Sequence, residues 1–146
     1  MVSDVVTLTQ ELIQIDTSNY GDSYETVGEA AAADYCVQRL REAGWDPEVI
    51  VTSSDSRRAV ALRIPGTDPT AAGLLIHGHL DVVPAVAPEW SKPAFGGVIE
   101  GGFIWGRGAV DMKDMDAMML VDNRRTQMHH NALKCVVRIG DLDYRD

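Results

Sequence analysis

The residues best suited to chemistry lie in the segment His79-Leu80-Asp81, which directly follows an apolar run. In an extended segment, residues two positions apart point to the same side, so His79 and Asp81 can act on one site. An imidazole can bind a metal ion while a neighbouring carboxylate fixes its tautomer. The structural alternative is a histidine at a strand end and an aspartate in a turn, and a lone pair of this kind is common.

Asp111 is the second candidate for a metal ligand. It follows the tight turn Gly106-Arg107-Gly108 and precedes a predicted helix. The two glycines allow close approach of the backbone. Aspartate is also a favoured helix N-cap, so the residue has a structural explanation as well. To act as a ligand, Asp111 would have to lie in a cleft beside His79.

The other polar residues near these positions are expected to serve the structure. Lys113, Asp114 and Asp116 are predicted to be charges of the first helical turn, where carboxylates suit the positive end of the helix dipole. Arg107 could pair with an acidic neighbour but is expected to coat the surface, and His77 could point into the same cleft but is expected to end a strand. Four methionines are predicted to pack in the core: Met112, Met115, Met118 and Met119.

Two helices are predicted ahead of the first strands. Ser3 can cap the first helix, whose apolar residues recur at spacings of three and four as far as Ile15. The second helix is predicted from about Tyr24 to Ala43 and ends at Gly44 in a left-handed conformation. Cys36 lies on its apolar face and is interpreted as a small core residue.

Strands are predicted at Pro47 to Thr52, Ala59 to Ile64 and Gly73 to Ile76. The last is an uninterrupted apolar run, which indicates a strand buried on both faces. Residues 98–105 predict a hairpin that turns at two glycines, and a helix follows Asp111. This order predicts an α/β fold, with a mostly parallel or mixed twisted sheet flanked by helices. Ligands bind beyond the carboxyl ends of strands in such sheets.

The bulk composition excludes several classes of partner. The chain of 146 residues fits one domain, and its net charge of −9 argues against nucleic acid or an anionic membrane as a main partner. Cys36 and Cys135 lie far apart and outside any Cys-x-x-Cys motif, which favours a reducing, cytoplasmic setting. Neither a signal peptide nor an apolar run of membrane-spanning length is visible.

Three segments resemble the M20 metallopeptidase family. Residues 75–84 resemble its GHxDVVP segment, and Trp90 with residues 93–97 resembles its W-x-x-x-P-F-x-G stretch, with Ala94 as an extra residue. Residues 102–113 are similar to its G-x-(I/L)-(W/Y)-G-R-G-(A/x)-x-D-M-K signature. The motifs occur in the family's order, and the resemblance covers roughly residues 1–120. It implies part of a zinc-aminopeptidase-like catalytic domain.

The resemblance implies a role for each matching residue. His79 would bind one zinc ion, Asp111 would bridge two, and Asp81 would be the nearby catalytic carboxylate that orients His79. The peptide bond between Asp111 and Met112 would be cis. Cobalt or manganese could substitute for zinc. The implied reaction is hydrolysis of amide bonds in small peptides or N-acyl amino acids, with a homodimer possible only for a full-length form.

The sequence departs from the family in two places. Asp114 stands where the family usually has glycine, as in a dipeptidase-like subset. Beyond Leu120 the family's adjacent glutamates, a general base and a zinc ligand, do not follow, since no glutamate occurs after Glu100. Residues 121–146 are therefore interpreted as a tail that does not match the family, through a frameshift or truncation. Residues 135–139 are compatible with a strand, and 129–130 with a solvated loop.

Three functional interpretations follow from these motifs. The chain is a metal-dependent amide hydrolase by lineage, or a non-catalytic remnant with the same fold, or an interaction module that exposes sheet edges to a partner. The missing glutamate pair favours the remnant for the chain as written, with marginal stability or aggregation when it is made alone.

Overall fold

The computed structural model describes residues 4–21, 27–52, 54–66, 68, 70, 72–126 and 134–139. These residues form three α-helices, six strands and a short 3-10 helix. In chain order they are α1 (Asp4–Ile13), α2 (Ala30–Glu42), β1 (Glu48–Val51), β2 (Arg58–Ile64), β3 (Gly73–Gly78), η2 (Ala87–Glu89), β4 (Val98–Glu100), β5 (Phe103–Trp105), α3 (Lys113–Thr126) and β6 (Lys134–Ile139).

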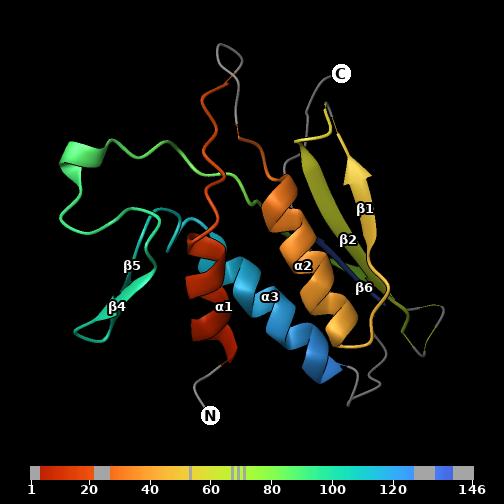
Figure 1. Ribbon diagram of the computed structural model, residues 1–146. Coiled ribbons are helices and arrows are strands. Elements are labelled where there is room, and N and C mark those ends of the chain that lie inside the picture. The colour runs from red at the N-terminus through yellow and green to blue at the C-terminus, as the bar shows by residue number, and fades with distance from the viewer. Residues whose placement is uncertain are drawn as a thin grey trace.

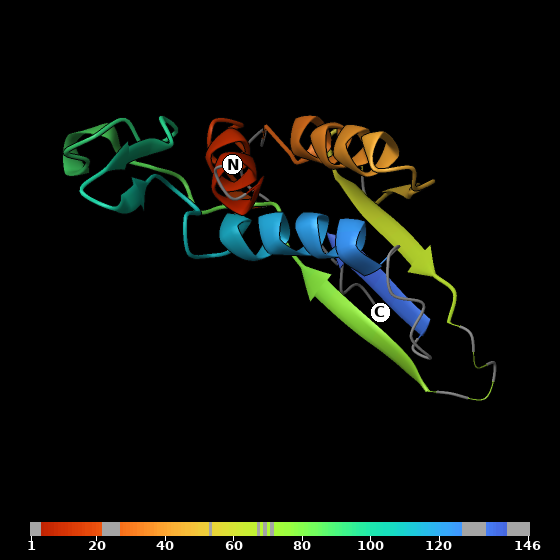
Figure 2. The ribbon, with the colours of Figure 1, turned by 90° about the horizontal axis from the view of Figure 1, so that it is seen from below.

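The main sheet has four strands in the order β1-β2-β6-β3. β1 pairs antiparallel with β2, β2 pairs antiparallel with β6, and β6 pairs parallel with β3. The three α-helices lie together on one face of this sheet (Figure 2). The β4–β5 hairpin lies apart from the sheet, on the other side of α1 (Figure 1). The predicted α/β class with a mixed sheet is confirmed.

The burial predicted for β3 is wrong. β3 stands at the end of the strand order, and β6 is its neighbour among the described strands. The Leu74 and Leu75 side chains are 47% and 64% exposed. An uninterrupted apolar run indicates burial on both faces only when elements cover both faces, and the described helices cover one. The predicted strand at residues 135–139 does form, as β6, and it provides the inner partner of β3.

The start predicted for the second helix, near Tyr24, is also wrong, since α2 begins at Ala30. Gly28 has a φ of +76°, and a Cβ there would collide with the backbone of Ser56. The Ala30 N–H then donates to the Ser56 carbonyl at 3.0 Å, which ties the start of α2 to the loop before β2. A left-handed residue cannot continue a right-handed helix, so the helix begins after Gly28. Its predicted end is confirmed, with Gly44 at a φ of +86°.

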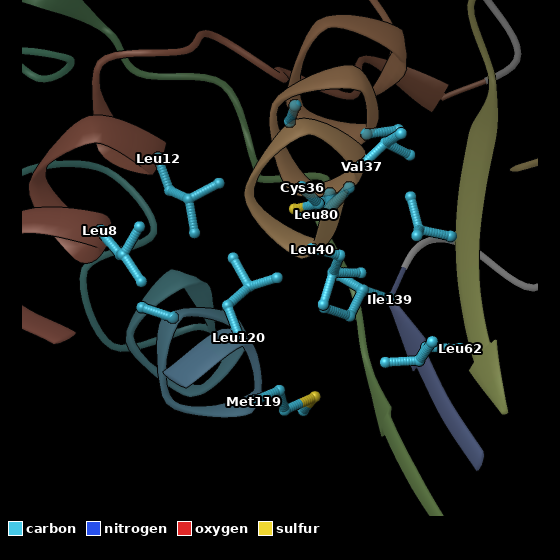
Figure 3. Packing of buried hydrophobic residues seen from close by; sticks show 14 of the residues in the cluster. Leu8, Leu12, Cys36, Val37, Leu40, Leu62, Leu80, Met119, Leu120 and Ile139 are labelled. Carbon is cyan, nitrogen blue, oxygen red and sulfur yellow. The ribbon is translucent and has the colours of Figure 1, made fainter. Parts of the chain in front are cut away.

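The hydrophobic core lies between the three helices and the sheet (Figure 3). Each leucine that is fully buried in this core contributes about 1.5–3 kcal/mol to the free energy of folding. Cys36 is fully buried among these side chains, as predicted. Apolar residues from separate parts of the chain meet here: Leu8, Leu12, Val37, Leu40, Leu62, Leu80, Met119, Leu120 and Ile139.

The face that α3 buries differs from the predicted methionine face. Met119 is buried and Met112 packs against the core, but Met115 and Met118 are 44% and 42% exposed. The buried positions of α3 are instead spaced by three and four residues, as one helix face requires. Two of these buried residues are charged, Lys113 and Asp116, and the others are Ala117, Met119 and Leu120.

The predicted hairpin is confirmed. β4 and β5 pair antiparallel and turn at Gly101 and Gly102, whose φ angles of +61° and +83° suit a tight two-residue turn.

Among the described helices, none is long and apolar enough to cross a membrane. The domain boundary proposed at Leu120 stays a prediction, and α3 runs across that position. Ser3 and residues 129–130 lie outside the described residues.

Candidate metal centre

His79 directly follows β3, at the carboxyl end of that strand. Gly78 makes this placement possible, because a Cβ there would collide with Asp116 Oδ1 and Met119 Cε. The absence of a side chain lets α3 lie directly against the strand end. The sheet and α3 therefore fix the backbone from which the imidazole of His79 extends.

Asp111 meets His79 at this strand end. Its Oδ1 atom lies 3.1 Å from His79 Nε2, and the Asp111 side chain is 88% exposed. The turn that carries it is held by hydrogen bonds from the Ala109 and Lys113 N–H groups to the Gly106 and Gly108 carbonyls. The Asp111–Met112 peptide bond is cis, as the family resemblance implied. Since α3 begins at Lys113, Asp111 is not its N-cap, and the structural explanation of this residue does not apply.

Asp81 binds the other side of the His79 ring. His79 Nδ1 lies 3.1 Å from Asp81 Oδ1 and 3.0 Å from the Asp81 carbonyl oxygen. Both oxygens are acceptors, so Nδ1 must carry the proton. In the neutral imidazole the lone pair is then on Nε2, which faces Asp111. This is the tautomer that a metal bound between His79 and Asp111 requires.

The charges around His79 raise its pKa. Burial acts to lower the pKa, but the hydrogen bond to the Asp81 backbone, the Asp81 and Asp111 carboxylates, and the hydrogen bond to Asp111 together outweigh it. Without a cation, these groups favour an imidazolium held between two acceptors. A cation bound at Nε2 would have to displace that proton, so protons and metal compete for one atom.

The segment that follows α1, residues 14–19, supports the His79 segment; we call it the α1 connector. Sequence reasoning assigned this segment no role in the site. The Thr17 hydroxyl donates to the Leu80 carbonyl at 2.6 Å, and the Val82 N–H donates to the Thr17 carbonyl at 3.1 Å. Asn19 Nδ2 donates to Asp81 Oδ2 at 3.0 Å. The only signal in the sequence is the run of Thr, Ser and Asn, whose side chains bond readily to nearby backbone.

Lys113 and Asp116 were predicted to be first-turn charges, but both are fully buried. Lys113 Nζ donates to the carbonyls of Leu12 at 2.9 Å and Ile15 at 2.7 Å, near the end of α1. Burial lowers the pKa of Lys113 to about 8, against the opposing effects of Asp16 and Asp116. Lys113 therefore links the segment that carries Asp111 to the α1 connector. The three- and four-residue spacing of 113, 116, 117 and 120 is the signal that sequence reasoning missed.

Neither carboxylate oxygen of Asp116 has a hydrogen-bond partner among the described residues. Burial raises the pKa of Asp116 to about 8, and the positive charges of His79 and Lys113 oppose that effect only in part. An unpartnered buried carboxylate is costly, because the charged form loses its hydration. The carboxyl group of Asp116 is therefore a source of instability beneath the His79 segment.

Arg107 was predicted to coat the surface, but its side chain also packs against another sequence motif. Its guanidinium lies over the Trp90 ring, 5.1 Å from the ring centroid, and the backbone N–H of Arg107 donates to the Ala94 carbonyl at 2.6 Å. Two of the sequence motifs thus pack on each other and hold the turn before Asp111. His77 is exposed on β3, and the ion pairs of this site, which join described residues, do not include it.

The donor types fit a divalent cation. One imidazole nitrogen and one carboxylate oxygen suit zinc, cobalt or manganese. Zinc usually takes three or four protein ligands. Within the described ranges, no group of three or more His, Cys, Asp or Glu side chains could hold a metal ion. Among the described residues, His79 Nε2 and Asp111 Oδ1 are two donor atoms that lie close enough to share one cation.

Comparisons with known proteins point to one family. Residues 75–134 match the family described as peptidase family M20/M25/M40. Aminoacylase-1 of Sus scrofa is 32% identical over 128 residues, which is 86% of this chain and 30% of that protein. A succinyl-diaminopimelate desuccinylase of Methylocella silvestris is 40% identical over 86 residues, 58% of this chain and 22% of that protein. The chain thus spans less than a third of the length of these relatives.

Solved structures share the fold. An M20 family metallo-carboxypeptidase, Sso-CP2, from Sulfolobus solfataricus superposes with a TM-score of 0.78 and 21% identity, over 96% of this chain and 31% of that one. Human carnosine dipeptidase 1 superposes with a TM-score of 0.74 and 16% identity, over 94% of this chain and 31% of that one. At these identities the likeness establishes the fold.

Proposed function

Because residues 75–134 belong to peptidase family M20/M25/M40, we propose that the chain carries part of the metal site of an amide-bond hydrolase, with zinc as its metal. The family implies dependence on a divalent metal. The observation that carries the proposal is the 3.1 Å separation of His79 Nε2 and Asp111 Oδ1, two atoms that can both bind one cation.

Each residue has a distinct task in this proposal. His79 presents the Nε2 lone pair, because Asp81 holds the ring proton at Nδ1. Asp111 presents an exposed carboxylate, which leaves its second oxygen accessible to a second cation. A cation bound there would polarise the scissile carbonyl and lower the pKa of bound water to about 7. The proposed substrates are small peptides or N-acyl amino acids, in line with the names of the relatives.

The experiment is to purify the 146-residue chain, measure bound zinc, and assay hydrolysis of a dipeptide and an N-acyl amino acid. The proposal expects zinc binding that His79→Ala and Asp111→Ala both abolish, with circular dichroism unchanged. Because the described residues supply two ligands, we expect weak binding and no measurable turnover by the chain alone. Zinc binding that survives both substitutions would overturn the proposal.

The alternative function is that of a non-catalytic remnant or an interaction module. The observations that favour it are the two-ligand donor set of the described residues and the exposed Leu74 and Leu75 on the sheet edge. Two bound zinc ions with turnover would rule out the remnant. A cytoplasmic location, a homodimer restricted to a longer form, and the absence of nucleic-acid or membrane partners stay predictions.

A further inference from the structure

We propose that Asn19 is a positioning residue of the metal site and acts on His79 through Asp81. This inference rests on the proposed function, because His79 is the proposed ligand. Asn19 lies 62 positions before Asp81 and belongs to none of the three motifs of the sequence. The α1 connector brings its side chain to the far side of the Asp81 carboxylate from the histidine ring.

Hydrogen bonds at both ends fix the orientation of the Asn19 amide. Its Oδ1 atom accepts the Gly21 N–H at 2.9 Å, and its Nδ2 atom donates to Asp81 Oδ2 at 3.0 Å. If the amide were flipped, its NH2 group would face an N–H donor and its oxygen would face a carboxylate. Since both contacts would then be repulsive, the donor must face Asp81.

The Asp81 carboxylate is therefore held by both oxygens. Oδ2 accepts from Asn19 at 3.0 Å, and Oδ1 lies 3.1 Å from His79 Nδ1. With one oxygen anchored by Asn19, the carboxylate plane cannot turn away from the ring without losing a hydrogen bond. Asn19 thus keeps Oδ1 at the position where it accepts the Nδ1 proton.

The consequence concerns which nitrogen of His79 is free to bind a metal. The Asp81 carbonyl oxygen also accepts from Nδ1, so the carboxylate strengthens the preference for a proton on that nitrogen. When the carboxylate turns away, a larger share of the neutral imidazole carries its proton on Nε2, and that tautomer has no lone pair facing Asp111. Outer partners of a ligating histidine typically change metal affinity by about 10–100-fold. Asn19 acts one residue further out, so we expect a smaller effect, about three- to tenfold.

Removal of the Asn19 side chain should leave the fold intact. The backbone of the α1 connector is held independently, by the Asn19 N–H bonded to the Val82 carbonyl at 2.8 Å and by the Val82 N–H bonded to the Thr17 carbonyl at 3.1 Å. Gln14 offers a matched control in the same connector. Its Nε2 atom donates to the Gly96 carbonyl at 3.2 Å, so its amide also holds a loop but bonds to none of the site residues.

The experiment compares Asn19→Leu, Asn19→Ala and Gln14→Leu in the full chain. The first readout is the imidazole 15N chemical shifts of metal-free His79 above its pKa, with His79→Gln used to assign the signals. The second is Zn2+ affinity, measured by competition with a chromophoric chelator. Both Asn19 variants should shift His79 toward the Nε2–H tautomer and weaken Zn2+ binding about three- to tenfold, whereas Gln14→Leu should change neither.

A double substitution tests the route through Asp81. In an Asp81→Asn background, Asn19→Leu should cause no further shift of the tautomer. A wild-type tautomer in both Asn19 variants, or an undiminished Asn19 effect in the Asp81→Asn background, would overturn the inference while the metal site stood. If the wild-type chain bound no Zn2+, the proposed function would fail, and the tautomer readout would still decide the role of Asn19.

Discussion

Lys113 and Asp116 are fully buried, one helical turn apart at the start of α3, yet they differ in what they bind. The Lys113 ammonium donates to two backbone carbonyls near the end of α1. The Asp116 carboxyl has no hydrogen-bond partner within the described part of the chain. Two charges in similar surroundings should therefore have opposite effects on stability when each is removed.

Lys113→Met should destabilise the protein by about 1–3 kcal/mol, because the carbonyls of Leu12 and Ile15 lose their buried donor. The lost desolvation penalty of the ammonium offsets part of this cost. The free energy of unfolding in urea measures the effect. Lys92→Met is the control, since Lys92 pairs with Glu100 at the surface and its removal should cost within about 0.5 kcal/mol. Equal effects of the two substitutions would contradict the structural role of Lys113.

Asp116→Leu should stabilise the protein at pH 8 by about 2 kcal/mol. The folded-state pKa of Asp116, about 8, lies above the ordinary value of 3.8. Protonation of this group therefore favours the folded state. Its contribution to stability is complete below about pH 4 and is lost as the pH rises through about 8. The advantage of Asp116→Leu should accordingly grow from pH 4 to pH 8 in thermal melts, and an advantage that stayed constant over this range would contradict the raised pKa.

Gly78→Ala should destabilise the protein by about 1–3 kcal/mol and weaken zinc binding, because the new Cβ collides with Asp116 Oδ1 and Met119 Cε. The collision would push α3 away from the strand end that carries His79. The Asp116→Ala substitution in the same chain should restore part of both properties, since it removes the carboxyl oxygen. Urea unfolding and zinc titration of both single variants and the double variant measure the coupling, and effects that simply add would contradict this explanation.

Zinc affinity should fall about tenfold for each unit by which the pH drops below the pKa of His79, because one proton competes with the metal for Nε2. That pKa is raised above its ordinary value of 6.5: burial acts to lower it, but the backbone hydrogen bond and the carboxylates of Asp81 and Asp111 raise it. Because this pKa is raised in the folded state, protonated His79 stabilises the metal-free protein, and this stabilisation is lost as the pH rises through the pKa of His79. Zinc titrations between pH 5.5 and 8 check the first effect, and a pH-independent affinity would show that His79 is not a ligand.

Leu75→Lys should reduce self-association without lowering the melting temperature, because the Leu75 side chain is 64% exposed on the terminal strand β3. A lysine on an edge strand opposes pairing with another chain. Val110→Lys is the matched control, since Val110 is 83% exposed but lies outside the sheet. Sedimentation velocity measures the association, and equal effects of both substitutions would show that the β3 edge is not the contact.

The sequence alone determined the features that depend on local pattern. The α/β order, the glycine hairpin at residues 98–105 and the end of α2 at Gly44 follow from periodicity and turn chemistry, and all three were confirmed. The motifs also identified His79, Asp81 and Asp111, which the structure brings together, although their role as a metal site stays a proposal.

Tertiary structure alone decided which charges are buried and which apolar side chains are exposed. Lys113 bonds to a carbonyl 98 positions away, and Asn19 to a carboxylate 62 positions away. Local periodicity cannot reveal such contacts, because they depend on which elements become neighbours in space. Leu75 is exposed for the same reason: its hydrophobicity sets what burial would gain, but only the arrangement of the strands determines whether a neighbour covers it.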